Sequence, residues 1–182
     1  LWTPSLPALL YRLASVLLLA TSVTAGAAGP SSDSTKDWSQ IGASAREAGL
    51  PVVVLVTGSG CGHCERMRGE FLADPGNSSP LTEQAVSAEL RRDSAGKIVD
   101  FDGERIRSRV FLSRYDVFAT PTLLFLDSAG LPLAAPIVGF NDAETYSGLV
   151  SERLTEARSE LQARAVQPAA EQEMGLGGVA RH

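Results

Sequence analysis

The segment PVVVLVTGSGCGHCERM, from Pro51 to Met67, decides the fold of this 182-residue chain. Its first six residues form a continuous β-branched and aliphatic run, which predicts a strand buried on both faces. The run ends at TGSG, and beyond it Cys64, Met67 and Phe71 recur close to helical spacing. The sequence therefore predicts a strand, a tight loop and a helix, with Cys61 at the helix N-terminus and Cys64 on its inner face.

The patterns on either side of this segment predict an α/β domain. Residues 38–48 place apolar side chains at helical spacing, and Gly49 follows where a left-handed C-cap belongs. The other predicted elements are a loop at 74–80, short strands within 85–90 and 97–102, a helix over 104–115, an antiparallel hairpin over 120–140, and a last helix with a capping box formed by Asn141 and Glu144. This order indicates a mixed central sheet flanked by helices.

The first 28 residues differ from the rest of the chain. They hold no acidic residue and one basic residue, Arg12, which precedes the apolar run LASVLLLATSV and the small-residue run TAGAAG. This layout is typical of a secretory signal peptide, and Ala25 with Ala27 supplies the A-x-A pattern of a cleavage site. We therefore expect a signal peptide at 1–28 and a periplasmic or secreted protein, with an uncleaved membrane anchor as the alternative.

Composition indicates one soluble globular domain. Hydrophobic residues make up 44% of the chain and charged residues 20%, values that exclude disordered and multi-span membrane classes. The net charge is -5 and no Lys/Arg-rich run occurs, so nucleic acid is not an expected partner. We expect a polar linker at 29–36, a folded domain at 37–164, a disordered tail at 165–182, and a monomer.

The two cysteines do not suit haem, zinc or a purely structural disulfide. A c-type haem site needs a histidine directly after the second cysteine, where this chain has Glu65. A structural zinc site needs four ligands, and besides the cysteines the chain offers only His63 and His182. A disulfide that encloses two residues restrains little of the unfolded chain. These exclusions leave redox chemistry.

Thiol–disulfide exchange needs an exposed thiolate with a lowered pKa and a second thiol nearby. At a helix N-terminus, Cys61 lies where unpaired backbone N–H groups favour an anion. Cys64, one turn later, can attack a mixed disulfide and release the partner. His63 is expected to stabilise the reduced form and to make the disulfide more oxidising. No metal or organic cofactor is needed.

From about residue 38 to 161 the sequence resembles thioredoxin-fold proteins. The similarity rests on PVVVLVTGSGCGHCERM, on YDVFATPTLLFLDSAG and on the VGF before the last helix. It is greatest to exported bacterial thioredoxin-like proteins of thiol–disulfide interchange, including those called SoxW-like. The resemblance implies a thioredoxin-like fold in which Pro121 is a cis-proline beside the cysteines. It also implies that Thr120 pairs with an extended partner peptide, and that Gly60 and Gly62 border the partner site.

Three features depart from thioredoxin itself. Ser59 stands where thioredoxin has a tryptophan, two residues before the first cysteine. Leu55 stands where it has a buried aspartate that helps to move the proton of the second thiol. The segment 74–103 has no counterpart in a minimal thioredoxin.

Together the residues and the resemblance predict an exported thiol–disulfide oxidoreductase that acts on protein thiols or disulfides. The direction of electron flow stays open, because an oxidase or isomerase fits the tetrapeptide Cys-Gly-His-Cys, whereas a reductase would need a membrane partner that supplies electrons. The alternative is a module that binds a partner protein or a copper ion without significant redox turnover, since two thiolates suit Cu(I).

Overall fold

The computed structural model describes residues 37–94 and 96–176. The predicted signal peptide at 1–28 and the predicted linker at 29–36 lie outside these residues. Within the described ranges, no helix combines the length and the apolar composition that crossing a bilayer requires.

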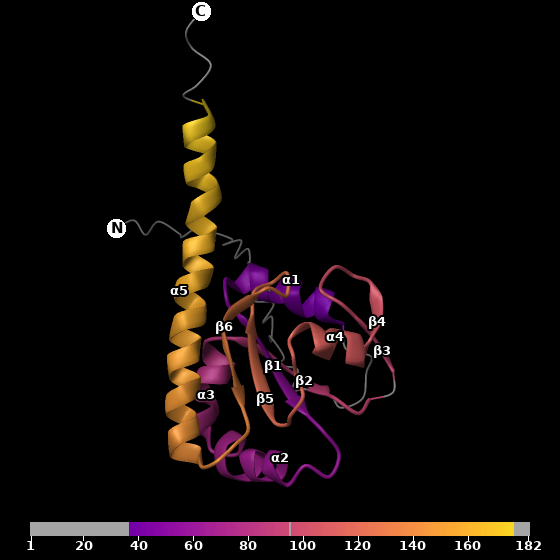
Figure 1. Cartoon of the computed structure of the whole chain (residues 1–182). Coiled ribbons are helices and arrows are strands. Elements are labelled where there is room, and N and C mark those ends of the chain that lie inside the picture. The colour runs from indigo at the N-terminus through magenta and orange to yellow at the C-terminus, as the bar shows by residue number, and fades with distance from the viewer. Residues whose placement is uncertain (1–36, 95, 177–182) are drawn as a thin grey trace, which may run out of the picture.

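A mixed four-stranded sheet forms the centre of the domain, as the sequence predicts (Figure 1). Its strands, in the order β2-β1-β5-β6, are β2 (Val86–Arg91), β1 (Val52–Thr57), β5 (Thr122–Leu126) and β6 (Pro132–Val138). Strand β1 runs parallel to β2 and antiparallel to β5, and β5 and β6 form the predicted antiparallel hairpin. The short strands β3 (Lys97–Val99) and β4 (Arg105–Arg107) pair with each other in a separate two-stranded sheet.

Helices cover both faces of the four-stranded sheet. One face carries α2 (Gly62–Met67) and the π-helical segment η1 (Arg68–Leu72) that continues it. The same face carries α3 (Pro75–Glu83) and α5 (Ala143–Leu176). The other face carries α1 (Trp38–Ala48) and α4 (Ser108–Arg114). Helix α1 ends at Gly49, which adopts the left-handed conformation (φ 65°) that a C-cap requires. The long helix α5 extends beyond the rest of the domain in Figure 1.

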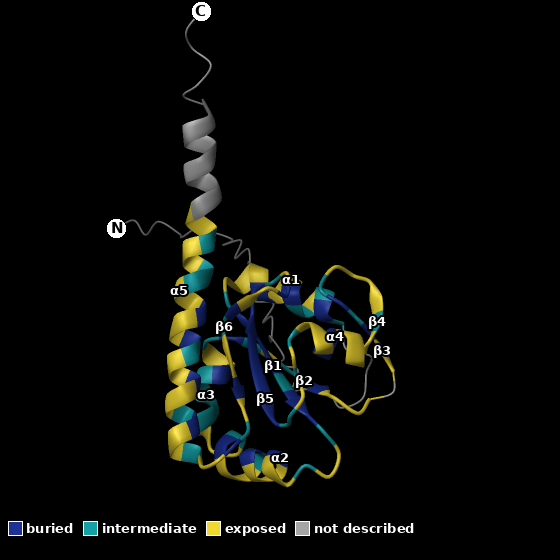
Figure 2. Cartoon of the chain, in the orientation of Figure 1, coloured by how far each residue is buried: buried dark blue, intermediate teal, exposed yellow. Residues whose placement is uncertain are grey.

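The core consists of two apolar layers, one on each face of the sheet. Alternate residues of the central strands serve the two layers: Val53 and Leu123 pack with α5, while Val54 and Leu124 pack with α1 and α4. All four side chains are at most 3% exposed, and Figure 2 shows the central strands as buried. The predicted burial of β1 on both faces is therefore confirmed.

The loop predicted at 74–80 is wrong, because helix α3 begins at Pro75. Asp74 is its N-cap, and the side chain accepts a hydrogen bond from the backbone N–H of Gly76 at 2.8 Å. Proline is well suited to the first helical position, where its missing N–H costs nothing. The sequence Asp-Pro-Gly, which is typical of turns, thus begins a helix here.

Three predicted boundaries are corrected by the structure. The helix predicted over 104–115 begins only at Ser108, because 105–107 pair with β3 as strand β4. The cap of α5 is Asp142 instead of Asn141, since the Asp142 carboxylate accepts from Thr145 N at 2.9 Å. Helix α5 continues through Leu176, so the domain boundary predicted at 164 falls inside this helix. Residues 177–182 of the predicted tail lie outside the described ranges.

Two leucines of α5 test how much this helix contributes to stability. Leu154 is fully buried and Leu149 is 36% exposed. We expect Leu154→Ala to lower the free energy of unfolding by about 2–5 kcal/mol, because it opens a cavity in the layer shared with the sheet. Leu149→Ala should cost less than about 1 kcal/mol. Urea unfolding followed by circular dichroism measures both, and equal losses would contradict the burial pattern.

Candidate functional site

The two cysteines form a disulfide at the N-terminus of α2. Cys61 is the N-cap residue of the helix and is partly exposed, whereas Cys64 lies one turn later and is fully buried. Gly60, directly before them, has a left-handed backbone (φ 66°), a conformation that glycine adopts without steric cost. The strand, turn and helix predicted from sequence therefore present one sulfur to the surface and place the other in the core.

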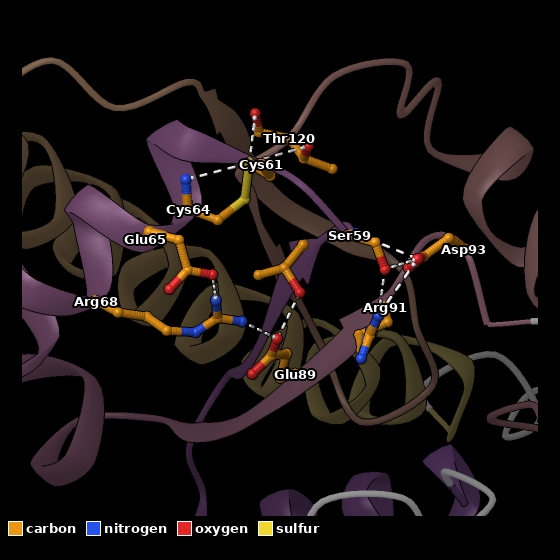
Figure 3. A network of polar contacts seen from close by, with 10 residues as sticks. Ser59, Cys61, Cys64, Glu65, Arg68, Glu89, Arg91, Asp93 and Thr120 are labelled. Carbon is orange, nitrogen blue, oxygen red and sulfur yellow. Dashed lines mark hydrogen bonds and ion pairs between the residues drawn. A yellow bond between two sulfur atoms is a disulfide. The ribbon is translucent and has the colours of Figure 1, made fainter.

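The sulfur of Cys61 has two partners, one from its own helix and one from a distant loop (Figure 3). The backbone N–H of Cys64 donates to Cys61 Sγ at 3.1 Å. The hydroxyl of Thr120 donates to the same atom at 3.4 Å, and Thr120 O lies 3.5 Å from it. In the reduced protein these two donors, together with the helix N-terminus, would stabilise a thiolate at Cys61.

The loop that supplies Thr120 comes from the start of β5, the strand paired antiparallel to β1. The peptide bond between Thr120 and Pro121 is cis, the isomer expected from the sequence resemblance. Pro121 is buried, and its carbonyl accepts from Gly139 N at 2.8 Å. The structure thus brings Cys61, Thr120 and Pro121 together as predicted.

The glycines beside Cys61 leave this face open. A Cβ atom built on Gly60 or on Gly62 would meet no heavy atom within 4 Å outside its chain neighbours. Both glycines are exposed. A partner chain could therefore approach the Cys61 sulfur without meeting side chains at these two positions.

His63 is exposed and contacts the loop between β6 and α5. Its Nδ1 lies 3.1 Å from the carbonyl oxygen of Phe140. Because a carbonyl can only accept, Nδ1 carries the proton and donates it. Arg66, also on α2, donates to Asn141 O at 2.8 Å. These two contacts fix α2 to the loop between β6 and α5, a role that sequence alone did not reveal.

Ser59, which replaces the tryptophan of thioredoxin, is held by a charged cluster at the end of β2. The Ser59 hydroxyl and backbone N–H both donate to Asp93 Oδ2, the N–H at 3.2 Å, and Arg91 donates to the hydroxyl. The hydrogen bond from Ser59 and then that from Arg91 lower the pKa of Asp93 to about 2. The sequence carries no signal for this cluster, because residues 91–93 reach Ser59 only through the pairing of β1 with β2.

A second charged network lies beside the disulfide, where thioredoxin has its aspartate. Leu55 leaves that position without a charge, but its register partner on β2 is Glu89. Glu89 accepts a hydrogen bond from Thr57, which is 1% exposed, and from Arg68 Nη2 at 2.6 Å. Figure 3 shows Arg68 also donating to Glu65. The carboxylate therefore joins the end of β1 to the helix that follows Cys64.

Within the part of the chain that the structure describes, no three His, Cys, Asp or Glu side chains are grouped so as to hold a metal ion. The arrangement offers instead one partly exposed sulfur with hydrogen-bond donors, one buried sulfur bonded to it, and the partly exposed residue Thr120 beside them. Chemically this set can accept and release two electrons as a dithiol and disulfide.

The fold of this chain is similar to that of known proteins. A family model described as the thioredoxin-like domain matches residues 41–153. A thioredoxin from Thermus thermophilus is 22% identical, with a TM-score of 0.51 over 64% of this chain and 83% of that chain. The C-terminal domain of Neisseria meningitidis DsbD in the oxidised form is 17% identical, with a TM-score of 0.48 over 63% of this chain and 90% of that one. No curated protein sequence matches significantly.

The cluster around Ser59 predicts a measurable pKa. We expect the Asp93 carboxylate to titrate with a midpoint at about 2, below its ordinary value of 3.8. A lowered pKa means that the contacts with Ser59 persist above pH 3.8 and are lost as the pH falls through about 2. Ser59→Ala should raise the midpoint, because it removes the largest cause of the shift. Carboxyl NMR measures both values.

The matched control for this titration is Ser44→Ala, which changes an exposed serine of α1 and should leave the Asp93 midpoint where it is. A wild-type midpoint near 3.8, or an unchanged midpoint in Ser59→Ala, would show that the cluster does not hold the loop before Cys61.

Proposed function

The chain belongs to the thioredoxin-like domain family, and on that premise we propose that it is an exported thiol–disulfide oxidoreductase that acts on protein substrates through Cys61 and Cys64. One observation carries the proposal. The two sulfurs are bonded at the start of a helix, one partly exposed and the other fully buried, beside the backbone of Thr120. This asymmetry suits one sulfur for attack and the other for resolution.

The exchange balances in two steps. In the reduced protein the Cys61 thiolate attacks one sulfur of a client disulfide, so that a mixed disulfide forms and the other client sulfur leaves as a thiolate. The Cys64 thiolate then attacks Cys61 Sγ, which re-forms the disulfide seen here and releases the second client thiol. Two electrons pass from the protein to the client, and the same steps in reverse oxidise a client dithiol.

The surrounding residues support defined roles in these steps. The Cys64 N–H and the Thr120 hydroxyl lie where they can stabilise negative charge on the Cys61 sulfur in the reduced protein. The backbone of Thr120, which lies beside the Cys61 sulfur, offers hydrogen-bonding groups to an extended client segment. Gly60 and Gly62 leave room for that segment.

Export is proposed from the sequence. The composition of residues 1–28, which lie outside the described ranges, supports a signal peptide. A disulfide between Cys61 and Cys64 is compatible with an oxidising compartment, where exported proteins act. We infer that the clients are protein thiols or disulfides met in that compartment.

Variants of the two cysteines test the enzymatic proposal. In Cys64→Ser the mixed disulfide cannot be resolved, so we expect disulfide-linked complexes with client proteins, visible on non-reducing gels and lost with reductant. Cys61→Ser is the matched control and should trap none, because Cys64 is fully buried. Both variants should lose catalysis of insulin reduction. Wild-type protein without exchange activity, or equal trapping by both variants, would overturn the proposal.

A second test concerns His63, whose imidazole is proposed to stabilise the reduced form. His63→Ala should lower the reduction potential by on the order of 30 mV, which for this two-electron couple corresponds to about 1.4 kcal/mol. Equilibration with glutathione buffers measures this potential.

The contacts of α2 with the loop after β6 provide the control for His63. Arg66→Met removes the hydrogen bond to Asn141 O but keeps the imidazole. If Arg66→Met lowers the potential as much as His63→Ala does, then the effect comes from the position of the helix and the proposed role of the imidazole is wrong.

A further inference from the structure

An exposed aromatic ring lies beside the candidate site. Phe118, two residues before Thr120, is 77% exposed, although phenylalanine is usually buried. It borders a groove whose apolar lining is Val117, Phe118, Ala119, Pro136 and Val138, and we call this the Phe118 groove. Val138, on β6, is itself 52% exposed. The groove therefore joins the loop before β5 to the end of the edge strand β6.

Several backbone contacts hold the loop that carries Phe118. The chain leaves α4 through Asp116, which has a left-handed backbone (φ 51°), and Val117 N donates back to Leu112 O at 3.1 Å. Arg92, at the end of β2, donates from Nη1 to the carbonyl of Phe118 at 2.9 Å. These hydrogen bonds hold the loop in place, and the Phe118 side chain remains exposed to solvent on it.

The chemistry of exchange brings a client to this surface. When a client cysteine bonds to Cys61, its neighbouring residues must lie close to Thr120, whose oxygen and hydroxyl contact the same sulfur. An extended chain advances about 3.3 Å per residue, so a residue two positions from the client cysteine is about 7 Å away. Phe118 is two residues from Thr120, and Val138 is the register partner of Thr122. The groove therefore begins two residues along the chain from Thr120, the residue that contacts the reacting sulfur.

We propose that the Phe118 groove binds an apolar side chain two residues from the reactive cysteine of a client, and so selects apolar over acidic client segments. This inference rests on the proposed function and names the substrate class of the same site. Phe118 and Val138 bury apolar surface against an aliphatic side chain. Asp116, which also lines the groove, disfavours a client carboxylate by like-charge repulsion.

The test uses symmetric disulfides of blocked heptapeptides as probes. Each peptide has cysteine at its centre, glycine elsewhere, and leucine, serine or glutamate two residues to either side of the cysteine. The full chain is first reduced with dithiothreitol and freed of it, and release of peptide thiol is followed in a single turnover. We expect the second-order rate constant to be about tenfold higher for the leucine peptide than for the serine peptide, and lowest for glutamate.

Two groove variants test whether the Phe118 groove causes the preference for leucine over serine. Phe118→Ser and Val138→Ser should reduce the leucine-over-serine ratio to about twofold or less, because each removes apolar contact from the groove. Leu131→Ser is the matched control, since Leu131 is 58% exposed but lies at the opposite end of the β5–β6 hairpin. It should keep the wild-type ratio. The rate with hydroxyethyl disulfide, which has no side chain for the groove, should be unchanged in all variants.

The outcomes separate this inference from the proposed function. A wild type that reduces hydroxyethyl disulfide but shows no preference among the peptides overturns the inference and leaves the function standing. The same holds if Phe118→Ser keeps the full preference, or if it slows hydroxyethyl disulfide as much as the leucine peptide. A wild type that reacts with none of the disulfides overturns the proposed function itself.

Discussion

The site depends on the antiparallel pairing of β1 with β5. This pairing sets the turn after β1 against the loop before β5, so that the Thr120 hydroxyl and carbonyl lie within 3.5 Å of the Cys61 sulfur. Without it, the helix N-terminus would still favour an anion at Cys61, but the sulfur would have neither the Thr120 hydroxyl nor the Thr120 backbone beside it. Both apolar layers of the core hold these two strands in register.

Charge around the disulfide is distributed differently from thioredoxin. With Leu55 on β1, the partly buried carboxylate belongs to the adjacent strand, where Glu89 is bound by Thr57 and Arg68. With Ser59 in place of the aromatic ring, the turn before Cys61 is fixed by Asp93 through polar contacts. Strand β2 and the residues directly after it thus supply charged groups on both sides of the site.

Much of the fold followed from local signals, and the errors have local causes. The aliphatic run of β1, the Gly49 cap and the β5–β6 hairpin were predicted because periodicity and turn chemistry act over neighbouring residues. Helix α3 was missed because Asp74 and Pro75 favour a turn and a helix start equally well. Strand β4 was missed because its arginines carry no strand pattern, and only pairing with β3 makes 105–107 extended.

The reactive pair could be recognised from the sequence: two cysteines one turn apart after a buried strand, with a proline far along the chain that the family places beside them. Tertiary structure alone decided the environment of that pair. It directed His63 to Phe140 O, placed Glu89 beside Leu55 and Asp93 beside Ser59, and left Phe118 exposed next to Thr120. The reason is physical: these contacts join residues that are distant in the chain, and sheet register and loop packing bring them together only once the core has formed.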